Sequence, residues 1–305
     1  MSMGRLMLIG AVQIGAAASL LCTADSTAAG ARTSAEILAA SRTSDWHPLD
    51  AGRTIYLELP QGRVVIELAP EFAPKAAANI VALSRAHFYD GLSITRVQDN
   101  YVVQWGDAQS TRPRGAALAK LPVEFTRSDT GLHFTALRDP DTYAPQTGFV
   151  QDFPAARDPV SSTAWLTHCY GAVGVGRDDD PASGDGRELY VVIGQAPRHL
   201  DRNITVVGRV LQGIERLASL PRGTGEMGAY VQTAERVPIR AMRVASDVPE
   251  AERSALEVLR TDTPLFDAWV ESRRTRAESW FVVPAGHIDV CNLSVPVREG
   301  PRRNR

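Results

Sequence analysis

Short stretches in which apolar and polar residues alternate dominate the first 246 positions of this 305-residue chain. Alternation with a period of two is typical of strands that have one buried face. Residues 54–59 and 63–68 alternate on both sides of a Pro-Gln-Gly turn, so they predict a β-hairpin. Later stretches of strand character cover residues 188–193, 205–211 and 238–244. Residues 121–125 predict a shorter edge strand.

Apolar residues spaced three or four positions apart predict helices elsewhere. A helix over residues 74–84 places Ala76, Ile80 and Leu83 on one face. It begins at Pro74, because proline is favoured in a first helical turn. Other predicted helices cover residues 34–41, 213–220, 249–260 and 264–276. Two strand-like stretches follow them, at residues 280–283 and 287–293.

The region around residues 109–165 interrupts this pattern and is interpreted as an insertion. Residues 138–160 are rich in Pro, Asp and Gly, which predicts a long surface loop. Such loops can carry partner specificity, although an inert packed insertion is the simpler interpretation. A polar loop over residues 177–186 has several carboxylates but lacks the spacing of a calcium-binding loop, so we predict no metal site there.

Composition and charge are ordinary for a globular protein. Hydrophobic residues make up 44% of the chain and charged residues 22%, and the formal net charge is −2. This balance gives no reason to expect a nucleic-acid partner. The basic end, with Arg298, Arg302, Arg303 and Arg305, is interpreted as a solvated terminus.

The first 29 residues have the pattern of a secretory signal peptide. Arg5 precedes an apolar segment over residues 6–21, and small residues offer cleavage after Ala24 or Ala28. The segment is short and Ala-rich for a membrane anchor, so we expect no stable membrane insertion after its removal. A periplasmic or secreted location follows. A lipoprotein signal that uses Cys22 is the alternative, although a Leu precedes that cysteine where a small residue is usual.

Signal removal leaves two cysteines, Cys169 and Cys291, in an oxidising compartment. They could form one disulfide, which would join the C-terminal region to the preceding domain. His168 and His287 lie near them in the sequence and would also permit a zinc site, but no CxxC pair supports it. Both possibilities stay open at this point.

The candidate chemistry lies between Ile94 and Asp107. Residues 101–103 are strand-prone, and an Asp-Asn turn before them would bring Arg96 and Gln104 together. A guanidinium has five donors, and a carboxamide both donates and accepts. The pair therefore suits recognition of neutral peptide groups. Nucleophilic attack is not expected, because this stretch contains no Ser, Cys or Lys.

The same stretch resembles the active-site strand of cyclophilin-type peptidyl-prolyl isomerases, written F-H-R-x-x-x-x-F-x-x-Q-G-G-D. The matching residues are Arg96, Tyr101, Gln104, Gly106 and Asp107, and the departures are Ile94, Thr95 and Trp105. Residues 62–91 are similar to the opening strand, helix and loop of the family. Residues 170–176 and 190–210 are similar to its later strands.

The resemblance implies a mainly β fold, a cyclophilin-like closed eight-stranded antiparallel β-barrel capped by two helices. The barrel would cover residues 53–246, with the insertion around 109–165. Residues 30–52 would form an N-terminal leader. Residues 247–305 would form a helical C-terminal extension with some strand, packed on the barrel.

The resemblance also implies a function: rotation about X-Pro bonds in folding exported proteins, without a cofactor. Arg96 would be the key catalytic residue, and Gln104 would orient the substrate backbone. The predicted substrate-binding residues are Tyr101, Val102, Tyr190, Leu200, Glu188 and His199. The expected partners are proline-containing polypeptides.

Several of these positions depart from the family pattern. Val102 and Tyr190 stand where a Met and a Phe are usual, Glu188 replaces a Gln, His199 replaces a Trp, and a His often found near Ile204 is absent. We therefore expect slower catalysis, weaker binding of cyclosporin-type inhibitors and a preference for basic residues near the proline. The alternative is a proline-peptide binding module with little or no turnover. A hydrolase that uses His168 lacks a nucleophile motif.

Overall fold

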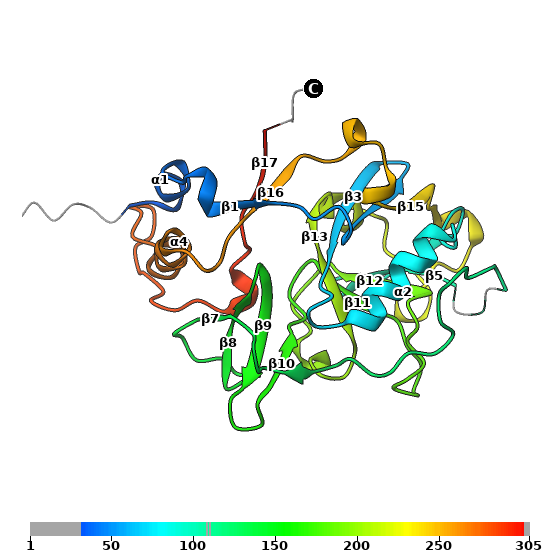
Figure 1. Ribbon diagram of the computed structural model, residues 1–305, viewed down its shortest axis with the longest axis horizontal. Coiled ribbons are helices and arrows are strands. Elements are labelled where there is room, and N and C mark those ends of the chain that lie inside the picture. Colours follow the sequence, from blue (N-terminus) through cyan, green and yellow to red (C-terminus); the bar gives the residue numbers. More distant parts are fainter. Residues whose placement is uncertain (1–31, 108, 110, 302–305) are drawn as a thin grey trace, which may run out of the picture. The chain divides into compact units, whose positions relative to one another are not determined.

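A nine-stranded antiparallel sheet forms the centre of the computed structural model, which describes residues 32–107, 109 and 111–301 (Figure 1). The predicted signal peptide, with Cys22 and both cleavage points, lies outside the described residues, as do Arg302, Arg303 and Arg305. Among the described residues, no helix is long and apolar enough to cross a membrane.

The strand order of the central sheet is β14-β4-β5-β12-β11-β13-β3-β2-β15. Its strands are β2 (Thr54–Leu59), β3 (Gly62–Leu68), β4 (Ser93–Val97), β5 (Val102–Gly106), β11 (Ala172–Val175), β12 (Glu188–Val192), β13 (Val206–Gln212), β14 (Val237–Pro238) and β15 (Ala241–Val244). The predicted hairpin and later strands are confirmed. The two end strands are neighbours in sequence, so the sheet curls until its edges approach the same stretch of chain. Nine strands replace the expected eight, and closure into a barrel stays a prediction.

Two helices pack on the apolar face of this sheet: α2 (Pro74–Arg85) and α3 (Ile214–Ala218). Both were predicted, and Ile80 and Leu83 of α2 are buried in the core as their spacing indicated. The predicted edge strand at residues 121–125 is wrong. This segment crosses the start of α2 instead, where the Glu124 carboxylate accepts hydrogen bonds from two backbone N–H groups of the first turn.

A second sheet replaces the surface loop predicted for residues 138–160. Its order is β6-β10-β9-β8-β7, and its strands are β6 (Arg127–Ser128), β7 (Phe134–Ala136), β8 (Gln146–Val150), β9 (Phe153–Asp158) and β10 (Thr163–Leu166). The prediction failed because the turn-forming residues flank strands rather than fill a loop. Phe149 and Phe153 are fully buried, and Phe149 packs edge-on against Phe266 at 5.2 Å.

A third sheet joins the two ends of the described chain. Its order is β1-β16-β17, formed by β1 (Trp46–Pro48), β16 (Leu256–Leu259) and β17 (Val297–Glu299). The predicted helix at residues 249–260 is therefore wrong. Its apolar residues contact partner strands on both sides, and all four residues of β16 are buried.

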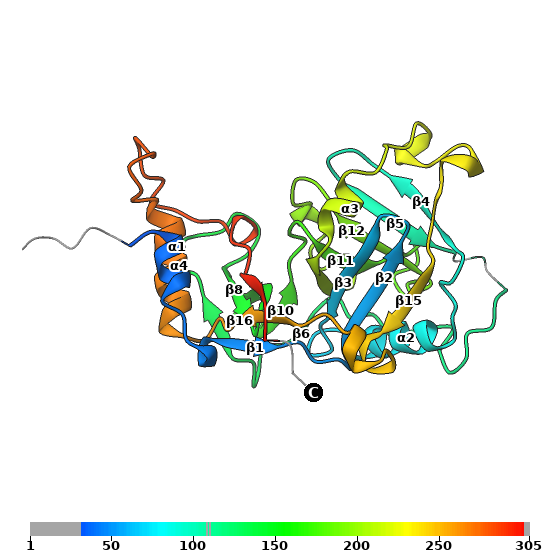
Figure 2. The same ribbon diagram turned by 90° about the horizontal axis from the view of Figure 1, so that it is seen from above.

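The helix predicted at residues 264–276 is confirmed as α4 (Pro264–Thr275), and α1 (Ser34–Ala39) lies beside it (Figure 2). The Ser34 and Ser272 hydroxyls are 2.9 Å apart across this contact. The α1 cap is Thr33 rather than Ser34. The strands predicted at residues 280–283 and 287–293 are wrong, because described residues 277–296 contain only one 3-10 turn, η7 (Val290–Asn292).

A buried ionic cluster joins the central sheet to the β8–β9 turn. Glu67 of β3 and Asp152 of the turn are fully buried. Arg53 Nη2 lies 2.8 Å from Glu67 Oε1, and Arg209 Nη2 lies 2.6 Å from Asp152 Oδ2. Burial and the neighbouring Asp152 carboxylate raise the pKa of Glu67 to about 9. Burial alone would raise the pKa of Asp152 too, but the Arg209 charge, the hydrogen bond from Glu67 and the charges of His47 and Arg53 together outweigh burial and lower that pKa to about 2.

This cluster predicts a stability that falls as pH rises. The unfolded chain releases the Glu67 proton near pH 4.3, roughly its ordinary pKa, whereas the folded protein keeps it until about 9. Between these pH values the folded state binds more protons than the unfolded state. Glu67 therefore lowers the free energy of unfolding by up to about 1.4 kcal/mol for each unit by which the pH rises. Glu67→Gln should remove this contribution, which urea unfolding at several pH values measures. Glu58→Gln in the same hairpin is the control. An unchanged slope in Glu67→Gln would show that Glu67 is ionised in the fold.

Candidate functional site

A row of side chains runs across four neighbouring strands of the central sheet. Arg96 of β4 lies opposite Gln104 of β5, Gln104 lies opposite Tyr190 of β12, and Tyr190 lies opposite Gly174 of β11. Residues directly opposite each other share a face of the sheet. The adjacent Val103 is fully buried in the core on the other face. The predicted catalytic pair and one predicted wall residue therefore lie side by side.

A β-bulge between Ile94 and Arg96 interrupts the pairing of β4 with β5. Bulges of this kind redirect the side chains next to them and are common beside active sites. Here the bulge returns Arg96 to the face that carries Gln104, while Ile94 stays in the core. The side chains of Arg96 and Gln104 both remain partly exposed, so a peptide could reach them.

The Arg96 guanidinium is held by three groups of the protein. Its Nη1 donates to Gln104 Oε1 at 3.0 Å, its Nε donates to the Met227 carbonyl at 2.7 Å, and its Nη2 donates to the Gln98 carboxamide. The charge also lies 5.7 Å from the Tyr101 ring centre. Burial lowers the pKa of Arg96, but a guanidinium stays protonated at physiological pH. The result is a fixed cation on the sheet face.

Two of these contacts could not be predicted from the family pattern. Gln98 follows Arg96 by two positions, so its place beside Arg96 agrees with the period of an extended chain. Met227 lies 131 positions from Arg96, in a turn that has no sequence signal for this role.

The predicted apolar wall is only partly assembled. Val102 and Tyr190 belong to one buried cluster, and Tyr101 packs against it. Phe153 and Leu166 of the second sheet lie in the same cluster, so Val102 is only 2% exposed and Tyr190 only 5%.

The other predicted wall residues lie away from that cluster. Leu200 and His199 are on a 3-10 turn, η2 (Arg198–Leu200), where His199 is exposed and Leu200 is partly buried. Ile204, which stands near the position where the family often has a His, packs against the cluster instead.

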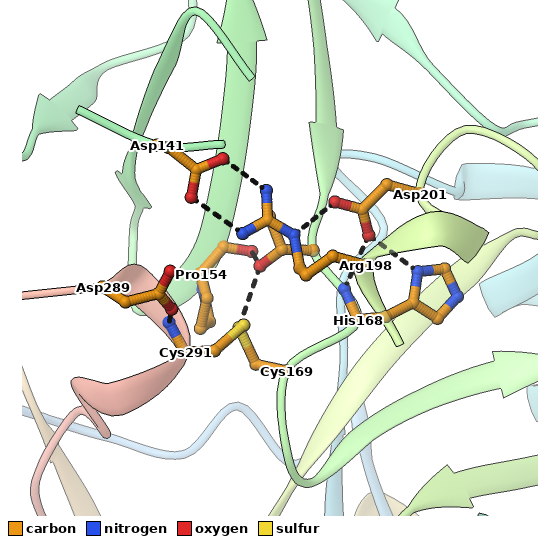
Figure 3. Close-up of a disulfide and its surroundings, with 9 residues drawn as sticks. Asp141, Pro154, His168, Cys169, Arg198, Asp201, Asp289 and Cys291 are labelled. Atoms are coloured by element: carbon orange, nitrogen blue, oxygen red, sulfur yellow. Dashed lines mark hydrogen bonds and ion pairs between the residues drawn. A yellow bond between two sulfur atoms is a disulfide. The ribbon is translucent and has the colours of Figure 1, made fainter. Parts of the chain in front are cut away.

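The Tyr190 hydroxyl, unexpected in an apolar wall, has a buried polar partner. It lies 2.9 Å from Nε2 of His168, whose Nδ1 lies 2.9 Å from Asp201 Oδ1. Arg198 donates to Asp201 and forms a two-point ion pair with Asp141 (Figure 3). An ionised Asp201 only accepts, so Nδ1 of His168 carries a proton toward it, and Nε2 shares a hydrogen bond with the tyrosine hydroxyl. Burial also raises the pKa of Tyr190 well above its ordinary value, so this hydroxyl stays neutral.

Gly174 makes room for this arrangement. A Cβ at that position would overlap the Tyr190 ring, so only glycine lets the ring lie over β11 and reach His168. The aromatic rings of Tyr190 and His168 are nearly parallel, at an angle of 7°. Neither Gly174 nor His168 was among the residues predicted for the site.

A disulfide lies directly beside this network. Cys169, which follows His168, is bonded to Cys291 with an S–S distance of 2.06 Å (Figure 3). It joins the segment that carries His168 to η7, where Asp289 caps the turn by accepting from the Cys291 N–H. Of the two possibilities left by the sequence, the disulfide is therefore the one present. The zinc alternative is excluded, since both sulfurs are used and His287 lies beside Asp139 instead.

Glu188 of β12 lies near Gln104. It lies on β12 opposite Gly106, and its Cβ and the Gln104 amide both border Gly176. Burial raises the pKa of Glu188, and the Asp178 and Asp107 carboxylates add to this effect. Three acidic side chains therefore lie near this end of the row, together with the Arg187 cation.

Comparisons with known proteins agree with this arrangement. The sequence profile of the family described as "Cyclophilin type peptidyl-prolyl cis-trans isomerase/CLD" matches residues 54–244. A probable peptidyl-prolyl cis-trans isomerase of Brucella suis is 25% identical over 190 residues, which are 62% of this chain and 81% of the relative. Peptidyl-prolyl cis-trans isomerase-like 4 of Mycosarcoma maydis is 26% identical over 63% of this chain and 32% of its own length.

A solved structure extends the similarity beyond the matched domain. Cyclophilin AquaCyp293 from Hirschia baltica superposes with a TM-score of 0.68 at 28% identity, covering 83% of this chain and 92% of its own. The sheet, the row on its face and these comparisons lead to one conclusion. The chain belongs to the cyclophilin-type peptidyl-prolyl cis-trans isomerase family.

Proposed function

We propose that this protein catalyses rotation about X-Pro peptide bonds, with Arg96 as the key residue. The observation that carries the proposal is the fixed and accessible Arg96 guanidinium. Its three protein contacts use three of its five N–H groups, so two remain to reach a substrate. Gln104, already bonded to Arg96, presents its amide N–H₂ for a substrate carbonyl.

The reaction needs no covalent step and no cofactor. The barrier of about 18–20 kcal/mol arises because rotation breaks the resonance of the amide. In the twisted state the proline nitrogen regains its lone pair and can accept a hydrogen bond, whereas in the planar amide it cannot. A donor aimed at that nitrogen therefore binds the twisted state more strongly than the planar one, which is the requirement for catalysis. In this proposal Arg96 supplies that donor, and its free N–H groups support the role.

We further propose that the substrates are proline-containing segments of exported proteins and that the protein works in the periplasm or outside the cell. The signal-peptide pattern of residues 1–29 supports the location. The disulfide between Cys169 and Cys291 supports it too, because such bonds persist in oxidising compartments. Closure of the nine-stranded central sheet into a barrel also belongs to this proposal.

One observation favours the alternative, a binding module with little turnover. Val102 and Tyr190 are almost completely covered by the second sheet, so the apolar wall offers a proline ring little surface. A shallow wall would hold the ring weakly and would exclude water poorly. In that case Arg96 and Gln104 would still bind the peptide backbone.

One assay distinguishes the isomerase from the binding module: the cis-to-trans isomerisation of a proline tetrapeptide is followed in the presence of the protein. The protein used is residues 32–305, the compact unit that holds every described element. The uncatalysed step takes tens of seconds or more, so catalysis is easy to detect. Acceleration in proportion to protein concentration supports the isomerase. Peptide binding by NMR without acceleration would replace it with the binding module.

The acidic end of the row predicts a substrate preference. Peptides with Lys just before the X-Pro bond should have a higher kcat/KM than matched Glu peptides, because Glu188 and its acidic neighbours attract the cation. Glu188→Gln should reduce this preference by about threefold to tenfold, in line with 1.4 kcal/mol for a factor of ten. Glu215→Gln on α3 is the matched control. If the Glu188→Gln variant still prefers Lys peptides to the same extent, the preference arises from another group.

A further inference from the structure

The loop that follows α4 carries the most exposed apolar run of the C-terminal region. Trp280, Phe281, Val282 and Val283, here called the apolar tip, are consecutive. Trp280 is 81% exposed, Val282 93% and Val283 81%. Single exposed apolar residues are normal on a protein surface, but a consecutive run with an aromatic pair indicates an interaction site.

The tip is held by its own side chains rather than by a core. The Trp280 and Phe281 rings pack edge-on with centres 4.9 Å apart. The Arg276 guanidinium lies 5.3 Å from the Phe281 ring centre. None of the four tip residues belongs to the apolar clusters of the described chain. The run is therefore exposed and stands outside the packed cores of the described residues.

Charged residues surround the base of the tip. Arg273 and Arg276 lie on or just after the last turn of α4, and Glu278 lies between them and the tip. The Arg273 Nε atom is buried and has no hydrogen-bond partner within the described chain. Long basic side chains at the base of an apolar tip can reach phosphate groups while the tip enters an apolar layer.

The position of the tip relative to the chain's start supports a membrane partner. Ser34 of α1 contacts Ser272 in the last turn of α4, and the tip follows that turn by a few residues. The described chain therefore begins near the base of the tip. Upstream of it in sequence is the apolar segment of residues 6–21, which is expected to bring the chain to a membrane during export.

We propose that the apolar tip docks the protein on a lipid bilayer surface. Trp and Phe would lie at the level of the headgroups, where aromatic rings are favoured, and the two valines would enter the acyl boundary. Glu278 offsets part of the charge of the two arginines, so apolar burial carries most of the binding. Neutral vesicles should therefore bind, and anionic lipid should strengthen binding only modestly.

Tryptophan fluorescence provides a selective test. The chain has five tryptophans, and Trp280 is the exposed one; Trp46, Trp105, Trp165 and Trp269 are at most 8% exposed. The probe is vesicles of phosphatidylcholine, with or without phosphatidylglycerol, added to residues 32–305. We expect a blue shift of the emission, lower quenching by acrylamide and co-sedimentation with both kinds of vesicle.

Two variants complete the experiment. The double variant Trp280→Ser, Val282→Ser should lower the vesicle partition coefficient by about tenfold or more, because binding scales with buried apolar area. Val160→Ser removes a 96% exposed valine from the β9–β10 turn and should leave binding unchanged. The rate of tetrapeptide isomerisation should be the same for the wild type, the double variant and Val160→Ser.

Several results would overturn the proposal. Absence of binding to both kinds of vesicle would do so, as would equal binding by the double variant. Concentration-dependent self-association that disappears in the double variant would assign the tip to a second copy of the chain. Binding only to anionic vesicles would assign it to the arginines rather than to the tip.

Discussion

Replacing Arg96 by alanine should lower kcat/KM for X-Pro isomerisation by about a hundredfold or more. Loss of one preorganised donor to a transition state typically costs a factor of about 10²–10³. Arg96 supplies two free N–H groups and a charge fixed by Gln98, Gln104 and Met227. Arg96→Lys should recover little, because an ammonium lacks the planar fork that these partners hold. The assay is tetrapeptide isomerisation at several substrate concentrations.

Stability and a neighbouring arginine provide the controls. Arg222 forms an exposed ion pair with Asp99 in the turn between β4 and β5, so Arg222→Ala removes a nearby arginine that contacts no member of the row. It should leave kcat/KM nearly unchanged. Urea unfolding must show that both variants are folded. If the Arg96→Ala variant is folded and keeps its isomerase activity, Arg96 is not required for catalysis and another group supplies the activity.

Removing the disulfide should produce the largest loss of stability. The bond joins Cys169 to Cys291 across 122 positions. Closing so long a loop restricts the unfolded chain, and the chain-entropy estimate is about 5 kcal/mol. Strain and residual structure usually reduce it, so we expect the Cys169→Ser, Cys291→Ser variant to lose about 3–5 kcal/mol in urea unfolding.

The disulfide prediction has an internal control. Residues 32–305 contain only these two cysteines, so a reducing agent should destabilise the wild type by a similar amount and leave the double variant unchanged. A loss below about 1 kcal/mol would show that the C-terminal region is held by its apolar contacts alone. Since Cys169 follows His168, NMR signals of the Tyr190 ring should also change when the bond is reduced.

The pairing of Arg96 with Gln104 could be predicted because it is local. A turn over residues 98–101 joins the two strands, so chain connectivity alone brings their ends together. The same holds for the hairpin of β2 and β3 and for helices α2 and α4, whose periodicity is complete within a dozen residues. For these elements the local pattern was sufficient.

The third sheet could not be predicted for the opposite reason. β16 pairs with β1, about 210 positions away, and with β17, which is also distant. Its buried residues suit either a helix or a buried strand, and only the partners decide between them. Likewise, β8 and β9 contain Gly148 and Pro154, which favour a loop until apolar partners from other segments cover the strands.

For Tyr190, in the apolar wall of the candidate site, the position was predicted but the partner of the hydroxyl was not. The family pattern placed Tyr190 at the site, but nothing local indicated where its hydroxyl would point. His168 lies 22 positions before it, and Gly174, on the adjacent strand, provides the space.

The sequence by itself thus determined the central antiparallel strands, the two helices of their core and the pairing of Arg96 with Gln104, because each depends on short-range periodicity and turns. Only the tertiary structure decided the second and third sheets, the cover over Val102 and Tyr190, and the choice of the disulfide over a zinc site. These features depend on contacts between distant segments. Burial of apolar surface in such contacts outweighs local propensity. The local sequence pattern does not indicate which distant segment will pack on an element.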